Sequence, residues 1–196
     1  MDRLDVDRAM VLVIDLQTKL LPLVAAHDAL LASALKLLAG TRVFGVPVLA
    51  TEQYPKGIGP THDAIRRGIE DPGTESSGRA RVVEKPTFSA CREPAVRAAL
   101  ADIDRPQVIV TGIETHVCVQ QTVLDLVAMD YDVFVCADAV GSRGAIDHER
   151  ALLRMQHVGA AVTTVESVLF ELCDRCDTAR FKQMLKVIKA SPPRDR

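Results

Sequence analysis

The sequence is poor in aromatic residues and has no excess of basic charge. It contains no tryptophan, two tyrosines and five phenylalanines. Lysine and arginine number 24 and aspartate and glutamate 26, which gives a formal charge of -2. Because nucleic-acid surfaces need clustered basic charge, we expect no nucleic-acid partner.

Long apolar runs, a complete set of disulfides and nucleotide-binding loops are also missing. The apolar stretches are interrupted by Asp15, Gln17 and Lys19, so the sequence predicts no membrane span and no membrane partner. The five cysteines cannot all pair internally, and the acidic N-terminus lacks the layout of a signal peptide. There is no GxGxxG or Walker motif. These absences favour a reduced, cytoplasmic protein that needs no cofactor.

Short apolar segments instead alternate with segments of helical periodicity. The predicted strands cover residues 9–15, 47–52, 81–85, 107–112, 132–138 and 160–165. The predicted helices cover residues 30–38, 93–100, 116–129, 148–158, 167–172 and 178–190. Such alternation predicts an α/β fold of the three-layer α/β/α type, with a mainly parallel sheet covered on both faces.

We expect one domain over residues 1–190 and a solvated C-terminal tail over 191–196. The segment 53–78 is rich in glycine and proline and is predicted to be irregular. A long irregular segment in a compact domain is typical of a lid or a subunit contact, and the sequence does not decide between them.

Three chemically active residues lie at or just beyond the carboxyl ends of predicted strands, where open α/β sheets bind ligands. They are Asp15, Lys85 and Cys118. A thiol with an ordinary pKa of about 8.5 is a weak nucleophile, but a helix start and a nearby cation favour the thiolate. Thr115 is placed to cap the helix that carries Cys118, Lys85 is a candidate cation, and Asp15 is a candidate general base.

Each of these residues also has an ordinary structural explanation. A cysteine between Val117 and Val119 is typical of a small buried apolar residue. An aspartate at a strand end is often part of a turn, and a lysine before Pro86 is often a surface residue. Their shared position on successive strand ends is what favours a joint chemical role.

The segments around these residues resemble the isochorismatase-like cysteine hydrolases. The matching segments are VLVIDLQ with Asp15, VEKPTFSA with Lys85 and VTGIETHVCV with Cys118. Further matches are ATEQYPKGIGPT, ADAVGSR and VTTVESVLFEL, which point to the subgroup of small isochorismatase domain-containing hydrolases. The resemblance covers nearly the whole chain and implies a six-stranded sheet of order 3-2-1-4-5-6.

The resemblance also implies a catalytic triad. Asp15 would be the general base, Lys85 its charge partner and Cys118 the nucleophile. A cis peptide bond would join Ile113 to Glu114, and the backbone N–H groups of Glu114 and Cys118 would form an oxyanion hole. In the implied strand order Lys85 starts two strands from Asp15, about 9–10 Å away, so its loop must lean inward for the two to meet.

Four residues near these segments are expected to line a substrate pocket: Gln17, Tyr54, Phe88 and His116. Phe88 is equally suited to the core and His116 to packing or capping. The side chain of Glu114 would either read a polar group of the substrate or face solvent.

Metal binding is not expected. Some relatives, the nicotinamidases, bind a metal through an aspartate and histidines after strand two. The corresponding segment here offers only Glu52 and His62, at a spacing that does not match. We therefore predict no catalytic metal and no nicotinamidase activity.

The other cysteines are predicted to be unreactive. Cys173 and Cys176 form a CxxC but lack a second ligand pair for zinc and the strand-to-helix setting of a redox site, so we expect them to be helical. Cys91 and Cys136 are expected to pack in the core.

The leading hypothesis is a cysteine hydrolase that cleaves a C–N bond of a small amide-like metabolite through a thioester. One alternative is a binding or scaffold protein that keeps the fold without catalysis. Another is cysteine-independent hydrolysis of a vinyl ether, as in isochorismatase proper. The resemblance also implies a homo-oligomer, which would be a dimer, a tetramer or a larger ring.

Overall fold

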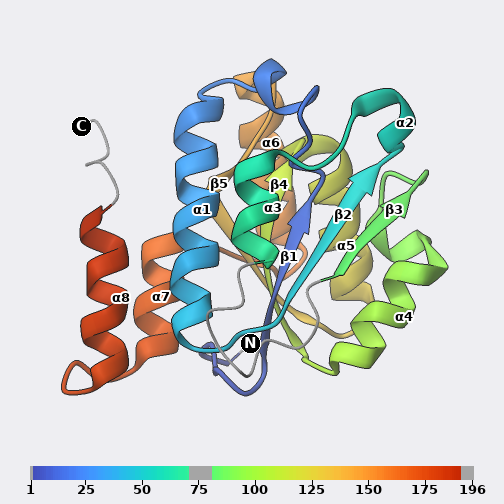
Figure 1. The fold of residues 1–196 in the computed structure, drawn as a ribbon. Coiled ribbons are helices and arrows are strands. Elements are labelled where there is room, and N and C mark those ends of the chain that lie inside the picture. Colours follow the sequence, from blue (N-terminus) through green and yellow to red (C-terminus); the bar gives the residue numbers. More distant parts are fainter. Residues whose placement is uncertain (1, 71–80, 191–196) are drawn as a thin grey trace.

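The computed structural model describes residues 2–70 and 81–190, and within these ranges it contains one six-stranded sheet (Figure 1). The strands are β1 (Ala9–Ile14), β2 (Val48–Gln53), β3 (Arg81–Lys85), β4 (Gln107–Ile113), β5 (Asp132–Gly141) and β6 (Ala161–Thr163). Their order is β3-β2-β1-β4-β5-β6, and every neighbouring pair is parallel. The expected order and fold class are confirmed.

Helices cover both faces of the sheet (Figure 1). The α-helices are α1 (His27–Val43), α2 (Pro55–Ile58), α3 (Asp63–Glu70), α4 (Pro94–Ile103), α5 (Gln120–Ala128), α6 (Ala145–His157), α7 (Val165–Cys173) and α8 (Ala179–Ala190). Shorter turns are the 3-10 helices η1 (Leu21–Leu23) and η2 (Ala90–Arg92) and the π-helix η3 (Thr115–Val119). Within the described residues, no helix is both long enough and apolar enough to cross a bilayer.

The side chains of β1 point alternately to the two faces of the sheet, and each face has its own hydrophobic core. Ala9, Val11 and Val13 belong to the core on the α1, α7 and α8 side, and Met10, Leu12 and Ile14 to the core on the α4, α5 and α6 side. All six residues are fully buried because successive side chains of a strand point to opposite faces. β1 is therefore packed on both faces, which fixes the position of its carboxyl end.

The prediction of an irregular segment over 53–78 is wrong for its first part. Residues 55–58 and 63–70 form α2 and α3. α3 forms because Ile65 and Ile69, four residues apart, share one helix face and are buried in the core beside α1. The rest of that segment, 71–78, and the predicted tail, 191–196, lie outside the described residues.

Candidate active site

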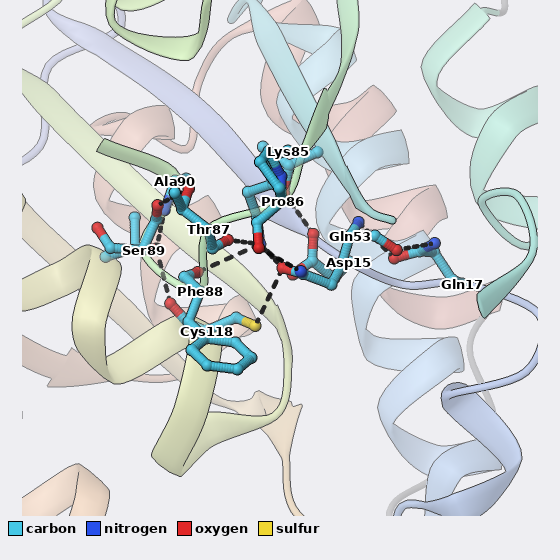
Figure 2. Close-up of polar contacts among 12 residues, drawn as sticks. Asp15, Gln17, Gln53, Lys85, Pro86, Thr87, Phe88, Ser89, Ala90 and Cys118 are labelled. Carbon is cyan, nitrogen blue, oxygen red and sulfur yellow. Dashed lines mark hydrogen bonds and ion pairs between the residues drawn. The ribbon is translucent and has the colours of Figure 1, made fainter. Parts of the chain in front are cut away.

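The carboxyl ends of β1, β2 and β3 meet the start of η3, and the three candidate residues come together there (Figure 2). Asp15 follows β1, Lys85 ends β3, and Cys118 lies in η3 after β4. They are 0%, 1% and 6% exposed, respectively. The parallel order of the sheet is what makes these strand ends neighbours, although they are up to 103 positions apart in the sequence.

Lys85 and Asp15 form a fully buried ion pair. Lys85 Nζ lies 2.6 Å from Asp15 Oδ2, and both side chains are 0% exposed. The ammonium also lies 2.7 Å from Gln53 Oε1 and 3.1 and 3.2 Å from the carbonyl oxygens of Thr87 and Phe88. The lysine side chain thus crosses the end of β2, as the strand order requires, and four acceptors neutralise and fix its charge.

The Cys118 thiol faces this ion pair, and its surroundings favour the protonated form. Burial and, to a lesser extent, the Asp15 carboxylate raise the pKa of the thiol to about 12, although the nearby Lys85 ammonium lowers it. The raised pKa runs against the expectation that the helix start and Lys85 keep Cys118 as a thiolate. The physical reason is that desolvation and a neighbouring carboxylate outweigh the helix end and the cation.

Two residues of β2 complete the site and were not predicted. Thr51 Oγ1 donates to Asp15 Oδ1 at 2.7 Å, and Gln53 Oε1 lies 4.0 Å from the Cys118 sulfur. Thr51 and Gln53 are two residues apart on a strand and so point to the same face. That alternation in the TEQ segment was the available signal, but it acquires meaning only once β2 is known to lie between β1 and β3.

The turn after β4 has a special backbone. The peptide bond between Ile113 and Glu114 is cis, at the position that the family resemblance implied. Gly112 has a φ of +138°, and a Cβ at this position would overlap the Ile14 carbonyl oxygen of β1. Only glycine allows the two strands to approach so closely at this turn.

The start of η3 arranges the candidate oxyanion donors. The N–H groups of Val117 and Val119 both donate to the Glu114 carbonyl oxygen, at 3.0 and 3.2 Å. The N–H of Cys118, which lies between them in the sequence, does not donate to that oxygen. The Glu114 carboxylate is already engaged, because it accepts from the backbone N–H and Nε of Arg143, both at 3.0 Å.

The four predicted pocket residues differ in their surroundings. Gln17 is buried, and its side chain forms hydrogen bonds with the backbone of Gln53 and Gly59. It therefore fixes the end of β2 beside the site. Tyr54 and Phe88 are 58% and 56% exposed. His116 Nδ1 lies 3.0 Å from Ser142 Oγ.

The loop that follows Lys85 is fastened to the helix that follows Cys118. Ser89 Oγ donates to Asp125 Oδ2 at 2.6 Å, and the N–H of Ala90 donates to Thr122 Oγ1 at 2.9 Å. Thr122 Oγ1 in turn donates to the carbonyl oxygen of Cys118 at 2.6 Å. The carbonyls that hold the Lys85 ammonium are therefore fixed relative to the sulfur.

The candidate metal ligands have other partners. Glu52 Oε1 accepts from the N–H and Oγ1 of Thr61, both at 2.7 Å, and from Arg66 Nη2 at 2.9 Å. His62 Nδ1 accepts from the N–H of Ala64 at 3.3 Å. Over residues 2–70 and 81–190, no group of three acidic, histidine or cysteine side chains is placed to hold a metal.

The remaining cysteines make no contact with the Asp15–Lys85 ion pair among the hydrogen bonds of the described residues. Cys91 and Cys136 are buried, and burial raises the pKa of both thiols, that of Cys91 to about 12. Cys173 ends α7, whereas Cys176 lies exposed in the turn that follows. The expectation that both would be helical is therefore wrong for Cys176, because α7 stops at Asp174, which adopts a positive φ of 56°.

Residues 9–167 match the family model of the isochorismatase domain. The chain belongs to the isochorismatase domain family. It is thus a member of the isochorismatase-like hydrolases, as its motifs indicated.

Individual relatives support this assignment. The chain is 37% identical over 180 residues to isochorismatase domain-containing protein 1 of Salmo salar, covering 91% of this chain and 60% of the relative. The chain thus spans about 60% of the length of the first curated relatives it matches.

Two solved structures of similar chains extend the likeness over almost the whole isochorismatase domain. The MAR1 ribonuclease of Caenorhabditis elegans superposes with a TM-score of 0.88 at 31% identity, covering 98% of this chain and 95% of that one. The YcaC gene product of Escherichia coli, described as an octameric hydrolase of unknown specificity, gives 0.86 at 27% identity, covering 95% and 91%.

Proposed function

We propose that the protein is a cysteine hydrolase that cleaves a C–N bond of a small amide-like metabolite through a thioester at Cys118. The observation that carries the proposal is the buried Asp15–Lys85 ion pair at 2.6 Å, which faces the Cys118 thiol. A buried thiol beside a buried carboxylate has a proton acceptor at hand, and the lysine keeps that carboxylate charged although it is buried.

The first half of the reaction forms the thioester. As the sulfur attacks the substrate's carbonyl carbon, Asp15 takes the thiol proton, because a thiol with a pKa of about 12 cannot supply a free thiolate. The carbonyl π electrons move to oxygen, and the N–H groups of Glu114 and Cys118 are the proposed donors to that oxyanion. When the intermediate collapses, the C–N bond breaks and Asp15 returns its proton to the leaving nitrogen.

The second half removes the acyl group. A water molecule attacks the thioester carbon, and Asp15 takes one of its protons. The C–S bond then breaks and the sulfur regains a proton from Asp15. The net reaction consumes one water and releases a carboxylic acid and an amine, and Lys85 stays an ammonium throughout.

Turnover of a panel of neutral primary and secondary amides, followed by release of ammonia or amine, tests the proposal. We expect Cys118→Ala and Asp15→Asn to abolish turnover, since each removes a group that reacts directly. Cys91→Ala is the matched control, because Cys91 is also a buried thiol whose pKa is raised to about 12, but it contacts the Thr122 carbonyl and not the Asp15–Lys85 pair. Mass spectrometry of the quenched reaction should find the acyl group on Cys118.

The other outcomes identify the alternatives. Activity that survives Cys118→Ala but not Asp15→Asn would indicate cysteine-independent hydrolysis, with a vinyl ether as the substrate to try next. If no amide is turned over and no acyl adduct forms, the protein is a binding member of the family.

Ribonuclease activity is a further alternative because several similar structures carry that name. The formal charge of -2 does not favour it, since binding to the phosphate backbone depends on clustered basic residues. Cleavage of single-stranded RNA that is lost in Cys118→Ala would replace the amide proposal.

We also propose that the chain assembles into a homo-oligomer in the cytoplasm. The support is that the YcaC gene product, to which the chain is similar over 95% of its length, is octameric. Light scattering at micromolar concentration checks this, and a monomeric mass would refute it.

A further inference from the structure

Gln53 occupies the centre of the site although nothing in the reaction requires a group at that position. It ends β2, which lies between β1 and β3 (Figure 1), and it pairs in register with Lys85. Figure 2 shows its side chain beside Asp15 and Lys85. It is 8% exposed. A buried amide carries two donors and an acceptor that must all find partners, so its orientation is informative.

The surroundings allow only one orientation of this amide. Oε1 accepts from Lys85 Nζ at 2.7 Å, while Nε2 donates to the Pro86 carbonyl oxygen at 2.9 Å. An ammonium requires the oxygen on its side, and a carbonyl requires the NH₂ group on the other. Gln17 fixes the backbone as well, because it accepts from the Gln53 N–H at 2.7 Å and donates to its carbonyl oxygen at 3.0 Å.

The amide oxygen of Gln53 competes with the Cys118 sulfur for the lysine. An ammonium has three N–H groups. In this structure the ammonium lies within hydrogen-bond distance of Asp15, Gln53 and the carbonyl oxygens of Thr87 and Phe88, and it also interacts with the Cys118 sulfur. The Cys118 thiol donates to the same Gln53 oxygen across 4.0 Å, so this oxygen is an acceptor for both groups, and its bond to the ammonium weakens the ammonium's hold on the sulfur.

The charges around Cys118 come from few groups. Asp15 and Lys85 are the charged residues that act on the thiol. Next to η3, Glu114 is paired with Arg143, and His148 of α6 bonds Thr115 Oγ1 at 3.0 Å. The balance between Asp15 and Lys85, and hence how the lysine's hydrogen bonds are shared, governs the protonation of the sulfur.

We propose that Gln53 is a positioning residue whose amide oxygen holds the Lys85 ammonium toward Asp15, so that Cys118 stays a thiol until a substrate reaches it and Asp15 takes the proton. This inference deepens the proposed function and rests on it for the role of Cys118. Its physical content, the sharing of one ammonium between an amide oxygen and a sulfur, is measurable without any substrate. A resting thiol is also less open to oxidation and alkylation than a thiolate.

The test is a titration of the Cys118 thiol in two variants. In Gln53→Met the acceptor shared by the ammonium and the thiol is lost, so Lys85 bonds the sulfur more strongly, which stabilises the thiolate. In Gln53→Glu a second carboxylate beside the lysine stabilises the thiol instead. We expect Gln53→Met to titrate at least about one pH unit below the wild type, which is roughly tenfold more thiolate at a given pH, and Gln53→Glu to titrate above it.

The measurement is the ultraviolet absorbance of the thiolate as a function of pH, over the range in which circular dichroism shows each protein folded, taken as the difference between each protein and its Cys118→Ala counterpart. It does not depend on how easily a reagent reaches the sulfur. Gln107→Met is the matched control, because Gln107 is also a buried glutamine with side-chain bonds to the backbone of Asp5 and Arg3, at the opposite end of the sheet. Its titration should coincide with that of the wild type.

Coincident titrations of Gln53→Met and the wild type, or an upward shift in Gln53→Met, would overturn the inference. So would an equal shift in Gln107→Met, which would indicate a general loosening of the fold. If circular dichroism shows that only one Gln53 variant folds, the direction of its shift decides. Because no hydrolysis is measured, failure here leaves the amide proposal standing, and a null result with amides leaves the titration meaningful.

Discussion

Replacing Lys85 by methionine should destabilise the protein far more than removing an ordinary surface ion pair. Lys85→Met keeps most of the side-chain volume but leaves the Asp15 carboxylate buried without a counter-charge. It also removes the donor to Gln53 and to two backbone carbonyl oxygens. Breaking one partner of a buried ion pair costs about 3–5 kcal/mol, because the remaining charge stays in a medium of low polarity.

Arg81→Met is the matched control because it lies on the same strand. Arg81 begins β3 and pairs with Asp102 at 2.7 Å, but the two side chains are 38% and 61% exposed. Water and salt screen such a pair, so its loss should cost about 0–1 kcal/mol. The comparison therefore separates the effect of burying an ion pair from the effect of having an ion pair at all.

Urea unfolding followed by circular dichroism measures the difference. With a typical slope of about 2 kcal/mol per molar urea, the midpoint of Lys85→Met should fall by about 2 M and that of Arg81→Met by less than about 0.5 M. The double variant Lys85→Met with Asp15→Leu should recover much of the loss, since it leaves no unpaired charge. Equal midpoints for the two single variants, or a double variant weaker than Lys85→Met, would refute the reasoning.

Two further predictions concern stability. Gly112→Ala should cost at least about 3 kcal/mol in unfolding free energy, because its φ of +138° and the backbone of β1 both exclude a Cβ. Gly159→Ala, with a φ of +106° and open space around it, should cost less, and equal urea midpoints would contradict this. The folded protein should also lose stability above about pH 9, since burial keeps the thiols of Cys91, Cys118 and Cys136 protonated while the unfolded chain ionises its own. The free energy of unfolding should be at its full value below pH 9 and should fall toward pH 12 by up to about 1.4 kcal/mol per pH unit for each thiol. In Cys91→Ala the urea midpoint should fall less steeply with pH, and an unchanged slope would contradict the prediction.

The sheet shows how much of the fold can be predicted from the local pattern of apolar residues. The run AMVLVI predicts a central strand because every one of its residues is apolar, and in the structure every one is buried. Strand and helix positions follow in the same way, to within a few residues at most ends. The short helix α3 was missed because its apolar face consists of only two residues, Ile65 and Ile69, in a segment rich in turn-forming residues.

For the candidate site, the sequence identifies the residues but not their interactions. Asp15, Lys85 and Cys118 stand at strand ends and in family motifs, so the sequence selects them. The sequence does not show what happens to their charges, because the pKa of Cys118 depends on burial and on Asp15, 103 positions away in the chain. The parts played by Thr51 and Gln53 likewise require knowing that β2 lies between the other two strands.

By itself, therefore, the sequence determined the order of strands and helices along the chain, the family and the candidate site residues, because periodicity and motifs are local properties of the chain. Only the tertiary structure decided that burial raises the pKa of the thiol, that one lysine has four acceptors, and that Gln53 contacts both the lysine and the thiol. These are consequences of desolvation and of distances between residues remote in sequence, and both exist only once the sheet has brought its strand ends together.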